Sequence, residues 1–344
     1  MRPIKRIILL LFAVTLFNSC EPNQSTSEIN VDDFLGQWTL EIEGGWVGWL
    51  DVRQEKGYLD ADLLWKWGSV LPASHTYIYN NSLRVTRVGD IVREKDENGN
   101  VTRVQTVTSI FKAKRVGKNI SGYFFEPSND GLTLTRTAFK GFKLPDVPAA
   151  PDLTSLKFGE PVHLFNGTDL SGWELTNKEQ VNGFMVEDGI LINDPIQPES
   201  GEHVNYGNLR TVTEFEDFNL KLEVNIPEGS NSGIYLRGIY EVQVYDTYGK
   251  PLDSHHMGGL YSRIAPSVNA EKPAGEWQTF DINLCNRHVT VILNGVTIID
   301  NQPVYGPTGG ALHADVSIPG PIYLQGDHGK VMYRNLVLTP IIKK

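Results

Sequence analysis

Hydrophobic residues alternate with polar ones along most of the chain, and this pattern constrains the fold more than any other feature. Residues 218–226, for example, read Phe-Asn-Leu-Lys-Leu-Glu-Val-Asn-Ile. A period of two places the apolar side chains on one face of a β-strand. Tight hairpin turns are indicated at Asn98-Gly99, Asp130-Gly131, Asp188-Gly189 and Asn294-Gly295. Because helical periodicity is missing, the sequence predicts an all-β protein.

A proline-rich stretch divides the expected strands into two groups. Residues 144–151 hold three prolines within seven residues, which cannot continue a sheet. We therefore place a linker at 144–160, an N-terminal β domain at 31–143 and a second domain at 161–344. About eight short strands in the first predict a small lipocalin-like β-barrel or sandwich. Roughly a dozen strands in the second predict a jelly-roll β-sandwich of two sheets.

Composition and charge exclude several classes of protein. The chain has 344 residues, of which 40% are hydrophobic and 21% charged, so it can bury a core and is not disordered. A formal net charge of −10 argues against a nucleic-acid partner, since that needs a basic face. Two cysteines cannot make a disulfide framework. After residue 20 there is no apolar run of about 18 residues, which excludes an integral membrane protein with spanning helices.

The N-terminus is typical of an export signal. Basic residues within 2–6 precede an apolar run at 7–17, and small residues then lead to Cys20. This resembles the lipobox of bacterial lipoproteins, which implies a signal peptide at 1–19, cleavage before Cys20 and a lipid on its sulfur. Residues 20–30 are polar and are expected to be a tether. The protein is then exported and lipid-anchored to a bacterial membrane, at its periplasmic face or the cell surface. The alternative is an ordinary signal peptide with an incidental cysteine.

Five of the seven tryptophans lie in the first domain, at positions 38, 46, 49, 65 and 67. Aromatic rings stack on the apolar faces of sugars, so these side chains suggest a carbohydrate-binding role. The simpler interpretation is that they fill the barrel. Trp65 and Trp67 are expected to share a face of their strand, and Trp38 has the alternation of a core position. Trp46 follows two glycines in a loop and is the best candidate for exposure.

Two predicted strands of the second domain each have one apolar and one polar face. One strand carries Glu241, Gln243 and Tyr245 on a single face, opposite two valines. The strand before it carries Tyr235 and Arg237 on one face. Large polar groups of this kind suit a cleft that grips a polyhydroxylated ligand. The alternative is a functionless surface salt bridge between Arg237 and Glu241.

Further candidate residues lie near these strands or near the C-terminus. Tyr323 and Gln325 share a face of a strand, and His328 follows in a turn, where it is a candidate base or metal ligand. Asn231 begins a polar turn before the Tyr235 strand. The loop 253–256 contains two adjacent histidines and could cover the cleft; such a pair binds metal in some proteins, although a surface pair is more common.

The second domain resembles a known family. His163-Leu-Phe-Asn-Gly-Thr-Asp-Leu-Ser-Gly-Trp173 is similar to the opening of the 3-keto-disaccharide hydrolase domain family, also described as 3-keto-glycoside hydrolases or lyases. Similar segments follow in order at 216–223, 231–237, 240–246, 273–277, 293–295, 320–325 and 328–335. The resemblance covers about 161–340 and does not include the first domain. One departure is Gly326, an insertion into the family's Leu-Gln-Asp-His-Gly run that is able to displace His328.

This resemblance implies a concanavalin-like jelly roll that acts on sugars oxidised at carbon 3. A ketone at carbon 3 acidifies the hydrogen on carbon 2. A base can remove that proton, and the enolate then expels the group on carbon 1. Hydration of the product completes a net hydrolysis. The implied activity is cleavage of 3-keto-glycosides or 3-keto-disaccharides by elimination across carbons 1 and 2.

The resemblance also suggests roles for individual residues. His328 or Glu241 would be the base, and Arg237 would clamp the substrate or the developing oxyanion. A divalent metal ion could polarise the ketone, with Glu241 and His328 as candidate ligands, and no nucleotide cofactor is expected. The residues expected to bind the substrate are Gln243, Gln325, Tyr235, Asn231, Tyr245 and Asp246.

Two other functions stay open. A conventional glycoside hydrolase on a jelly roll needs two carboxylates, but the next residue on the face of Glu241 is Gln243 rather than an acid. A non-catalytic glycan-binding lipoprotein would use the tryptophans of the first domain and the polar cleft of the second. The sequence carries no prediction of the natural aglycone, the anomeric preference or the oligomeric state.

Overall fold

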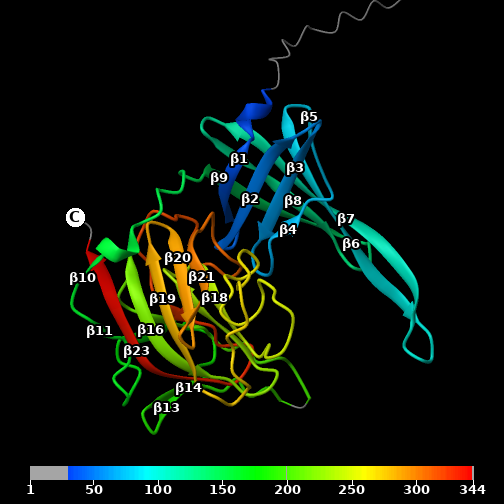
Figure 1. The fold of residues 1–344 in the computed structure, drawn as a ribbon. Coiled ribbons are helices and arrows are strands. Elements are labelled where there is room, and N and C mark those ends of the chain that lie inside the picture. Colours follow the sequence, from blue (N-terminus) through cyan, green and yellow to red (C-terminus); the bar gives the residue numbers. More distant parts are fainter. Residues whose placement is uncertain (1–29, 199, 343–344) are drawn as a thin grey trace, which may run out of the picture.

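The computed structural model describes residues 30–198 and 200–342, which fold into two β-structures joined by an extended segment (Figure 1). The predicted signal peptide at 1–19, Cys20 and nearly all of the tether lie outside the described residues. The two short 3₁₀ turns are η1 (Val31–Asp33) and η2 (Leu153–Ser155). Within the ranges that the structure describes, no helix is long and apolar enough to cross a membrane.

The N-terminal structure is a closed antiparallel barrel. Its strands are β1 (Gly36–Ile42), β2 (Trp46–Glu55), β3 (Tyr58–Trp65), β4 (Leu71–Pro72), β5 (His75–Tyr79), β6 (Ser82–Lys95), β7 (Val101–Val116), β8 (Asn119–Pro127) and β9 (Leu134–Lys143). Successive strands pair as a meander, with β4 attached at the side of β3. Because β1 pairs with both β2 and β9, and β2 also pairs with β3, the sheet closes on itself. The predicted small barrel is confirmed.

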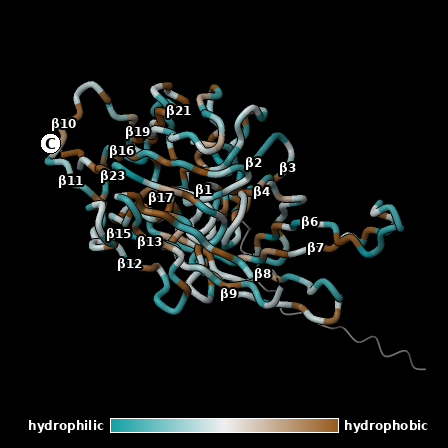
Figure 2. Tube along the Cα trace, turned by 90° about the horizontal axis from the view of Figure 1, so that it is seen from below, coloured by the Kyte–Doolittle hydropathy of each residue, from teal (hydrophilic) through white to brown (hydrophobic). Residues whose placement is uncertain are grey.

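Aromatic side chains fill the interior of the barrel. Trp38 is completely buried, and Trp65 packs against Phe124 with ring centroids 4.5 Å apart. Phe111 and Phe139 stack at 4.2 Å beside them. The outer halves of β6 and β7 leave the barrel as a two-stranded ribbon, which projects from the body in Figures 1 and 2.

The second structure is a sandwich of two sheets. Its strands are β10 (Lys157–Phe158), β11 (Val162–His163), β12 (Trp173–Leu175), β13 (Phe184–Glu187), β14 (Ile190–Asn193), β15 (Leu209–Thr211), β16 (Phe218–Asn225), β17 (Asn231–Leu236), β18 (Tyr240–Tyr245), β19 (Gln278–Cys285), β20 (His288–Leu293), β21 (Val296–Pro303), β22 (Tyr323–Leu324) and β23 (Val331–Ile342). One sheet has the order β13-β14-β23-β16-β19-β20-β21, with β10 and β11 also on β23. The other has the order β12-β15-β22-β17-β18.

The core lies between these two sheets. Leu220 and Leu222 of β16 are buried on one side, and Val242 and Val244 of β18 are buried on the other, in one hydrophobic cluster. Figure 2 shows hydrophobic and hydrophilic residues alternating along many of the strands. The predicted hairpin at Asn294-Gly295 joins β20 to β21, and both residues have positive φ, as such a turn requires. The all-β jelly-roll sandwich is therefore confirmed.

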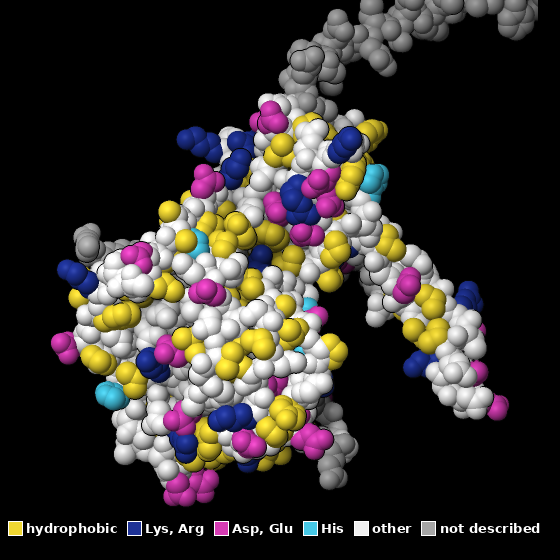
Figure 3. Space-filling view, viewed as in Figure 1, with side chains coloured by type: hydrophobic (Ala, Val, Ile, Leu, Met, Phe, Trp, Pro, Cys, Tyr) yellow, Lys and Arg dark blue, Asp and Glu magenta, His cyan; other side chains and the backbone are white. Residues whose placement is uncertain are grey.

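The barrel packs directly on the sandwich. Trp49 points outward from β2, yet it is only 4% exposed, and its indole nitrogen donates to the carbonyl of Tyr305 at 3.2 Å. The guanidinium of Arg263 lies 4.3 Å from the Trp49 ring centroid. Leu64 and Leu144 join the same hydrophobic cluster as the sandwich core. Figure 3 shows hydrophobic side chains gathered where the two structures meet.

Candidate active site

A cavity of about 890 Å³ lies over the five-stranded sheet, where the sandwich meets the barrel. Its floor comes from β17, β18 and β22. Loops of the sandwich at 176–180, 205–208, 309–312 and 325–328 form most of the wall, and the barrel adds residues 44–46 and 67–68. None of the residues that line it is a lysine or an arginine. The cavity therefore suits a neutral polar ligand better than an anion.

Glu241 lies at the floor of this cavity and is 4% exposed. Burial raises the pKa of its carboxyl to about 8, and only the hydroxyl of Tyr235, 2.9 Å from Oε2, opposes that shift. The ring of Tyr235 stacks on Tyr323 at 3.8 Å. The Tyr323 hydroxyl donates to the carbonyl of Gly310 at 3.1 Å. At neutral pH this carboxyl is therefore mostly protonated.

The proton positions around Tyr235 follow from counting donors. Its hydroxyl lies within hydrogen-bonding distance of two acceptors, Oε2 of Glu241 at 2.9 Å and the carbonyl of Gly309 at 2.8 Å. A hydroxyl has one proton and can donate to only one of them. When Tyr235 donates to Gly309, Glu241 loses the hydrogen bond that stabilises its charged form, and this adds to the effect of burial. The network therefore favours the neutral acid.

Three side-chain amides of the cavity have oxygens without a partner. Oε1 of Gln243, Oε1 of Gln325 and Oδ1 of Asn231 are buried, and the described residues give them no hydrogen bond. A buried acceptor left unpaired costs about 1–3 kcal/mol, so such groups are normally satisfied in the working state of a protein. Hydroxyl groups of a bound ligand would satisfy all three.

His328 also lines the cavity, at its rim. Its side chain is exposed to the cavity, and crowding by the surrounding protein lowers its pKa, although nearby Asp327 opposes that shift. The neutral imidazole is therefore favoured near neutral pH. The inserted Gly326 packs against the backbone of Gly207, where a Cβ would come within 2.1 Å of the carbonyl oxygen. The insertion is absorbed by this close approach, and His328 remains at the cavity.

Comparison with known protein families identifies the family to which the residues at the floor of this cavity belong. Residues 160–339 match the 3-keto-alpha-glucoside-1,2-lyase-like domain, which is just over half of the chain. The chain belongs to this family. The lyase-like domain contains the whole floor of the cavity and places the protein in a family of carbohydrate-active enzymes.

Solved structures similar to the lyase-like domain come from Parabacteroides distasonis, from proteins provisionally named glycosyl hydrolases. One is 28% identical, and the match covers 57% of this chain and 93% of that one with a TM-score of 0.43. Another is 21% identical, and the match covers 53% and 94% with a TM-score of 0.42. No curated protein matches the chain.

Three predicted site residues of the lyase-like domain lie away from the cavity. Arg237 has a φ of 54°, which ends the alternation of β17, and its guanidinium donates to the carbonyls of Val316 and Ile318. The prediction that it shares a face with Tyr235 is therefore wrong. Tyr245 lies under the ammonium of Lys250 at 4.9 Å. Asp246 accepts a hydrogen bond from the backbone of Gly229 at 2.8 Å. Neither of these two lines the cavity.

The predicted metal ligands, Glu241 and His328, both line the cavity. In the described part of the chain, no group of three or more His, Cys, Asp or Glu side chains is arranged to hold an ion. Glu241 keeps its proton and already faces Tyr235, so it is a poor ligand. In the loop 253–256, His255 places one ring nitrogen 2.5 Å from Asp253 and the other 2.8 Å from Ser69 of the barrel. This histidine joins the two structures.

Two groups at the cavity were not predicted from the sequence as site residues. Asp327 lines the cavity together with Glu241 and accepts a hydrogen bond from the backbone of Tyr206 at 3.0 Å. The barrel contributes Trp46 and Trp67, whose rings meet edge to face at 4.6 Å. The exposure of Trp46 was predicted. The expectation that Trp67 shares a face with Trp65 is wrong, because the intervening residue has a φ of 69° and turns Trp67 outward.

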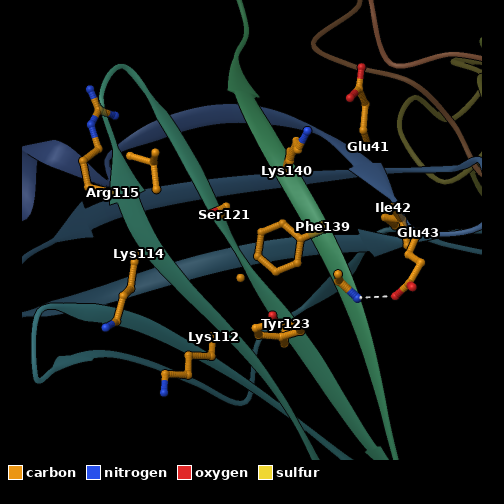
Figure 4. A pocket seen from close by; sticks show the side chains of 13 residues that line it. Glu41, Ile42, Glu43, Lys112, Lys114, Arg115, Ser121, Tyr123, Phe139 and Lys140 are labelled. Atoms are coloured by element: carbon orange, nitrogen blue, oxygen red, sulfur yellow. Dashed lines mark hydrogen bonds between the residues drawn. The ribbon is translucent and has the colours of Figure 1, made fainter.

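A second cavity, of about 760 Å³, lies on the barrel over β1, β7, β8 and β9. Figure 4 shows lysines of β7 and β9 around Tyr123 and Phe139, with Glu43 bonded to the backbone of β9. None of its lining residues has a buried polar atom without a partner. It also lies outside the residues that match the lyase-like family. The cavity of Glu241 is therefore the stronger candidate for the active site.

Proposed function

We propose that this protein cleaves 3-keto-glycosides by eliminating the aglycone across carbons 1 and 2, with His328 as base and Glu241 as acid. The observation that carries this proposal is the buried Glu241 carboxyl, which holds its proton to about pH 8 in a cavity lined by no lysine or arginine. An elimination that expels an alcohol needs such a donor near neutral pH. The neutral imidazole of His328, at the rim of the same cavity, supplies the matching base.

The first half-reaction uses both groups once. His328 takes the proton from carbon 2, and the electron pair of that C–H bond forms an enolate with the carbon 3 ketone. The enolate collapses to a carbon 1–carbon 2 double bond and restores the ketone, while the bond from carbon 1 to the aglycone oxygen breaks. Glu241 gives its proton to that oxygen. The products are the free alcohol and an unsaturated 3-keto sugar.

The second half-reaction returns both groups to their starting states. Water adds to carbon 1, the position conjugated with the ketone, and gives a proton to the Glu241 carboxylate. His328, now protonated, delivers its proton to carbon 2. The sum of the two halves is hydrolysis of the glycoside, with no oxidant, reductant or metal consumed.

The unpartnered amides bind the sugar in this scheme. Gln243, Gln325 and Asn231 present buried oxygens that accept from sugar hydroxyls, and the amide N–H groups of Gln325 and Asn231 are the donors available to the enolate. Arg237 has no part in this, because its guanidinium is committed to the loop at 316–318. Neutral hydrogen-bond donors are sufficient to stabilise the enolate, because Glu241 is still protonated at that stage and adds no negative charge beside it.

We also propose that the protein works outside the cytoplasm on a lipid anchor at Cys20. Support comes from the basic start, the apolar run and the small residues before Cys20. In a bacterial expression host, Cys20→Ser should abolish labelling by radioactive palmitate and release the protein from membranes. Labelling that persists in this variant would contradict the anchor.

The test of the activity compares a 3-keto-glucoside with its parent glucoside in heavy water. We expect aglycone release from the keto compound alone, with one deuterium at carbon 2 of the released sugar, because the proton on the exposed His328 exchanges with heavy water before it is delivered. A sample without enzyme corrects for spontaneous exchange of the keto sugar. Release from both compounds, without deuterium, would instead favour a conventional hydrolase using Glu241 and Asp327, which line the same cavity. Release from neither would favour a glycan-binding protein.

A further inference from the structure

Two tryptophans of the barrel stand at the edge of the proposed active site. Trp46 begins β2, and Trp67 lies just beyond the end of β3. They meet edge to face with an interplanar angle of 89°, and they remain 42% and 60% exposed. Large aromatic side chains are usually buried, so a pair left open beside a polar cavity is a candidate ligand surface.

The backbone holds this pair against the sandwich. Lys66 and Gly68, on either side of Trp67, both have positive φ, which forms a tight turn. Gly68 packs so closely on Gly309 that a Cβ at position 309 would lie 2.3 Å from the Gly68 carbonyl oxygen. The amide of Gly310 donates to the carbonyl of Lys66 at 3.3 Å. The tryptophan pair is therefore attached to the loop whose carbonyls bind Tyr235 and Tyr323.

The two sides of the cavity differ in chemistry. The sandwich side carries the acid, the base and the unpartnered amides, which suit the polar groups of the oxidised sugar. The barrel side carries indole rings and glycines. Indoles stack on flat apolar surfaces, such as the face of a pyranose or of an aromatic ring. A substrate whose sugar occupies the sandwich side directs its leaving group toward the barrel.

We propose that Trp46 and Trp67 form an aglycone subsite, so that the barrel selects substrates whose leaving group is a ring. This inference rests on the proposed function and adds a substrate class to it. Both a second sugar and an aromatic alcohol present the required flat face. The barrel, which lies outside the residues that match the family, is then a specificity module built into the active site.

The test measures kcat/KM for three 3-keto-glucosides, with methyl, 4-nitrophenyl and glucosyl leaving groups. For Trp46→Ala and Trp67→Ala, we expect kcat/KM for a ring-bearing substrate, divided by kcat/KM for the methyl substrate, to fall roughly tenfold. The fall should come from a higher KM for the ring-bearing substrate. A fall confined to the nitrophenyl substrate identifies an aromatic aglycone, and one confined to the glucosyl substrate identifies a sugar. Ratios equal to those of the wild type would overturn the subsite.

The control is Tyr58→Ala, which removes an aromatic side chain that is 62% exposed on the barrel and does not line the cavity. Calorimetry with unoxidised phenyl glucosides of both anomers separates the subsite from catalysis, because elimination cannot cleave them. Weaker binding to both tryptophan variants, but not to Tyr58→Ala, supports the subsite even if the wild type has no turnover. Unchanged binding, alongside normal turnover of the wild type, refutes the subsite and leaves the proposed function intact.

Discussion

Gly233 lies directly against the carboxyl of Glu241, and a Cβ at position 233 would come within 2.4 Å of Oε1. The two residues are neighbours across β17 and β18, where Gly233 pairs with Gln243. A glycine is required here because any other side chain occupies the space of the acid. The absence of a side chain at one position of β17 therefore sets the position of the acid on β18.

The first prediction is that Gly233→Ala lowers kcat by roughly a hundredfold while the acid itself is retained. The methyl group forces the carboxyl to move, and a displaced acid loses much of its advantage in proton transfer. The matched control is Gly89→Ala, since a Cβ at position 89 on β6 meets no atom within 4 Å. Steady-state kinetics with a 3-keto-glucoside would measure both. Equal rates in the two variants would show that the position of Glu241 is unimportant.

The second prediction concerns Glu241→Gln, which keeps the size of the side chain but removes its transferable proton. General acid catalysis contributes about 10²–10⁴ in rate, and more of it is needed for a poor leaving group. We expect kcat to fall by roughly 10³ for a sugar leaving group and by much less for 4-nitrophenol, whose anion leaves unaided. Aglycone release from the two substrates measures this. A loss of the same size for both would assign Glu241 a role other than acid.

The third prediction is the pH dependence of kcat/KM. The acid must be protonated, and the pKa of Glu241 is raised to about 8 by burial, so the rate should fall above about pH 8. The base must be neutral, and the pKa of His328 is lowered from 6.5, so the rate should fall only below that value. The alkaline limb should vanish in Glu241→Gln. An alkaline limb that persists in this variant belongs to another group.

The fourth prediction concerns stability, and it follows from the same raised pKa. Between pH 4.5, the ordinary pKa of a glutamic acid, and about pH 8, the folded protein keeps the Glu241 proton and the unfolded chain does not. Glu241 therefore contributes a fall of about 1.4 kcal/mol per pH unit to the free energy of unfolding in this window, and the lowered pKa of His328 partly opposes it. In denaturant titrations, the free energy of unfolding of the wild type minus that of Glu241→Gln should fall as the pH rises through this window. Parallel curves would mean that the pKa is not raised.

Strict alternation explains why part of the site could be predicted from the sequence. Glu241 and Gln243 face the cavity, and Val242 lies in the core, because β18 is regular throughout. The same rule failed at Trp67 and Arg237. Positive φ at Lys66 in one case, and at Arg237 itself in the other, turns the chain at a residue type that rarely adopts it, and the glycines that follow at 68 and 238 are the local signal of these turns.

The barrel's part in the site could not be predicted from local patterns. Trp46 and Trp67 reach the cavity only because outward-facing residues of the barrel pack on the sandwich, a contact that joins positions far apart in sequence. Asp327 was missed for a similar reason, since it follows β22 and reaches the cavity of Glu241 only through the tertiary fold. Period-two patterning assigns residues to faces, whereas the docking of two β-structures depends on which outer side chains are apolar and complementary.

The fifth prediction tests that docking through Trp49. Its ring is buried against Arg263 and Gly306, and its indole nitrogen donates to Tyr305, so Trp49→Ala removes the centre of the contact. Truncation of a buried tryptophan costs about 3–5 kcal/mol. We expect scanning calorimetry to show a lower melting temperature and the separation of one transition into two, because the barrel and the sandwich have separate hydrophobic cores.

The matched control for Trp49→Ala is Trp46→Ala, which truncates a tryptophan on the same strand that is 42% exposed. Removing an exposed ring should change the melting temperature little. The two variants also separate the functions of the barrel's outer tryptophans. Trp49→Ala should reduce cleavage of methyl and ring-bearing substrates alike, because the loop at 309–310 that binds Tyr235 loses its support from the barrel. Full activity with a single unchanged transition in Trp49→Ala would show that the barrel and the sandwich do not depend on this contact.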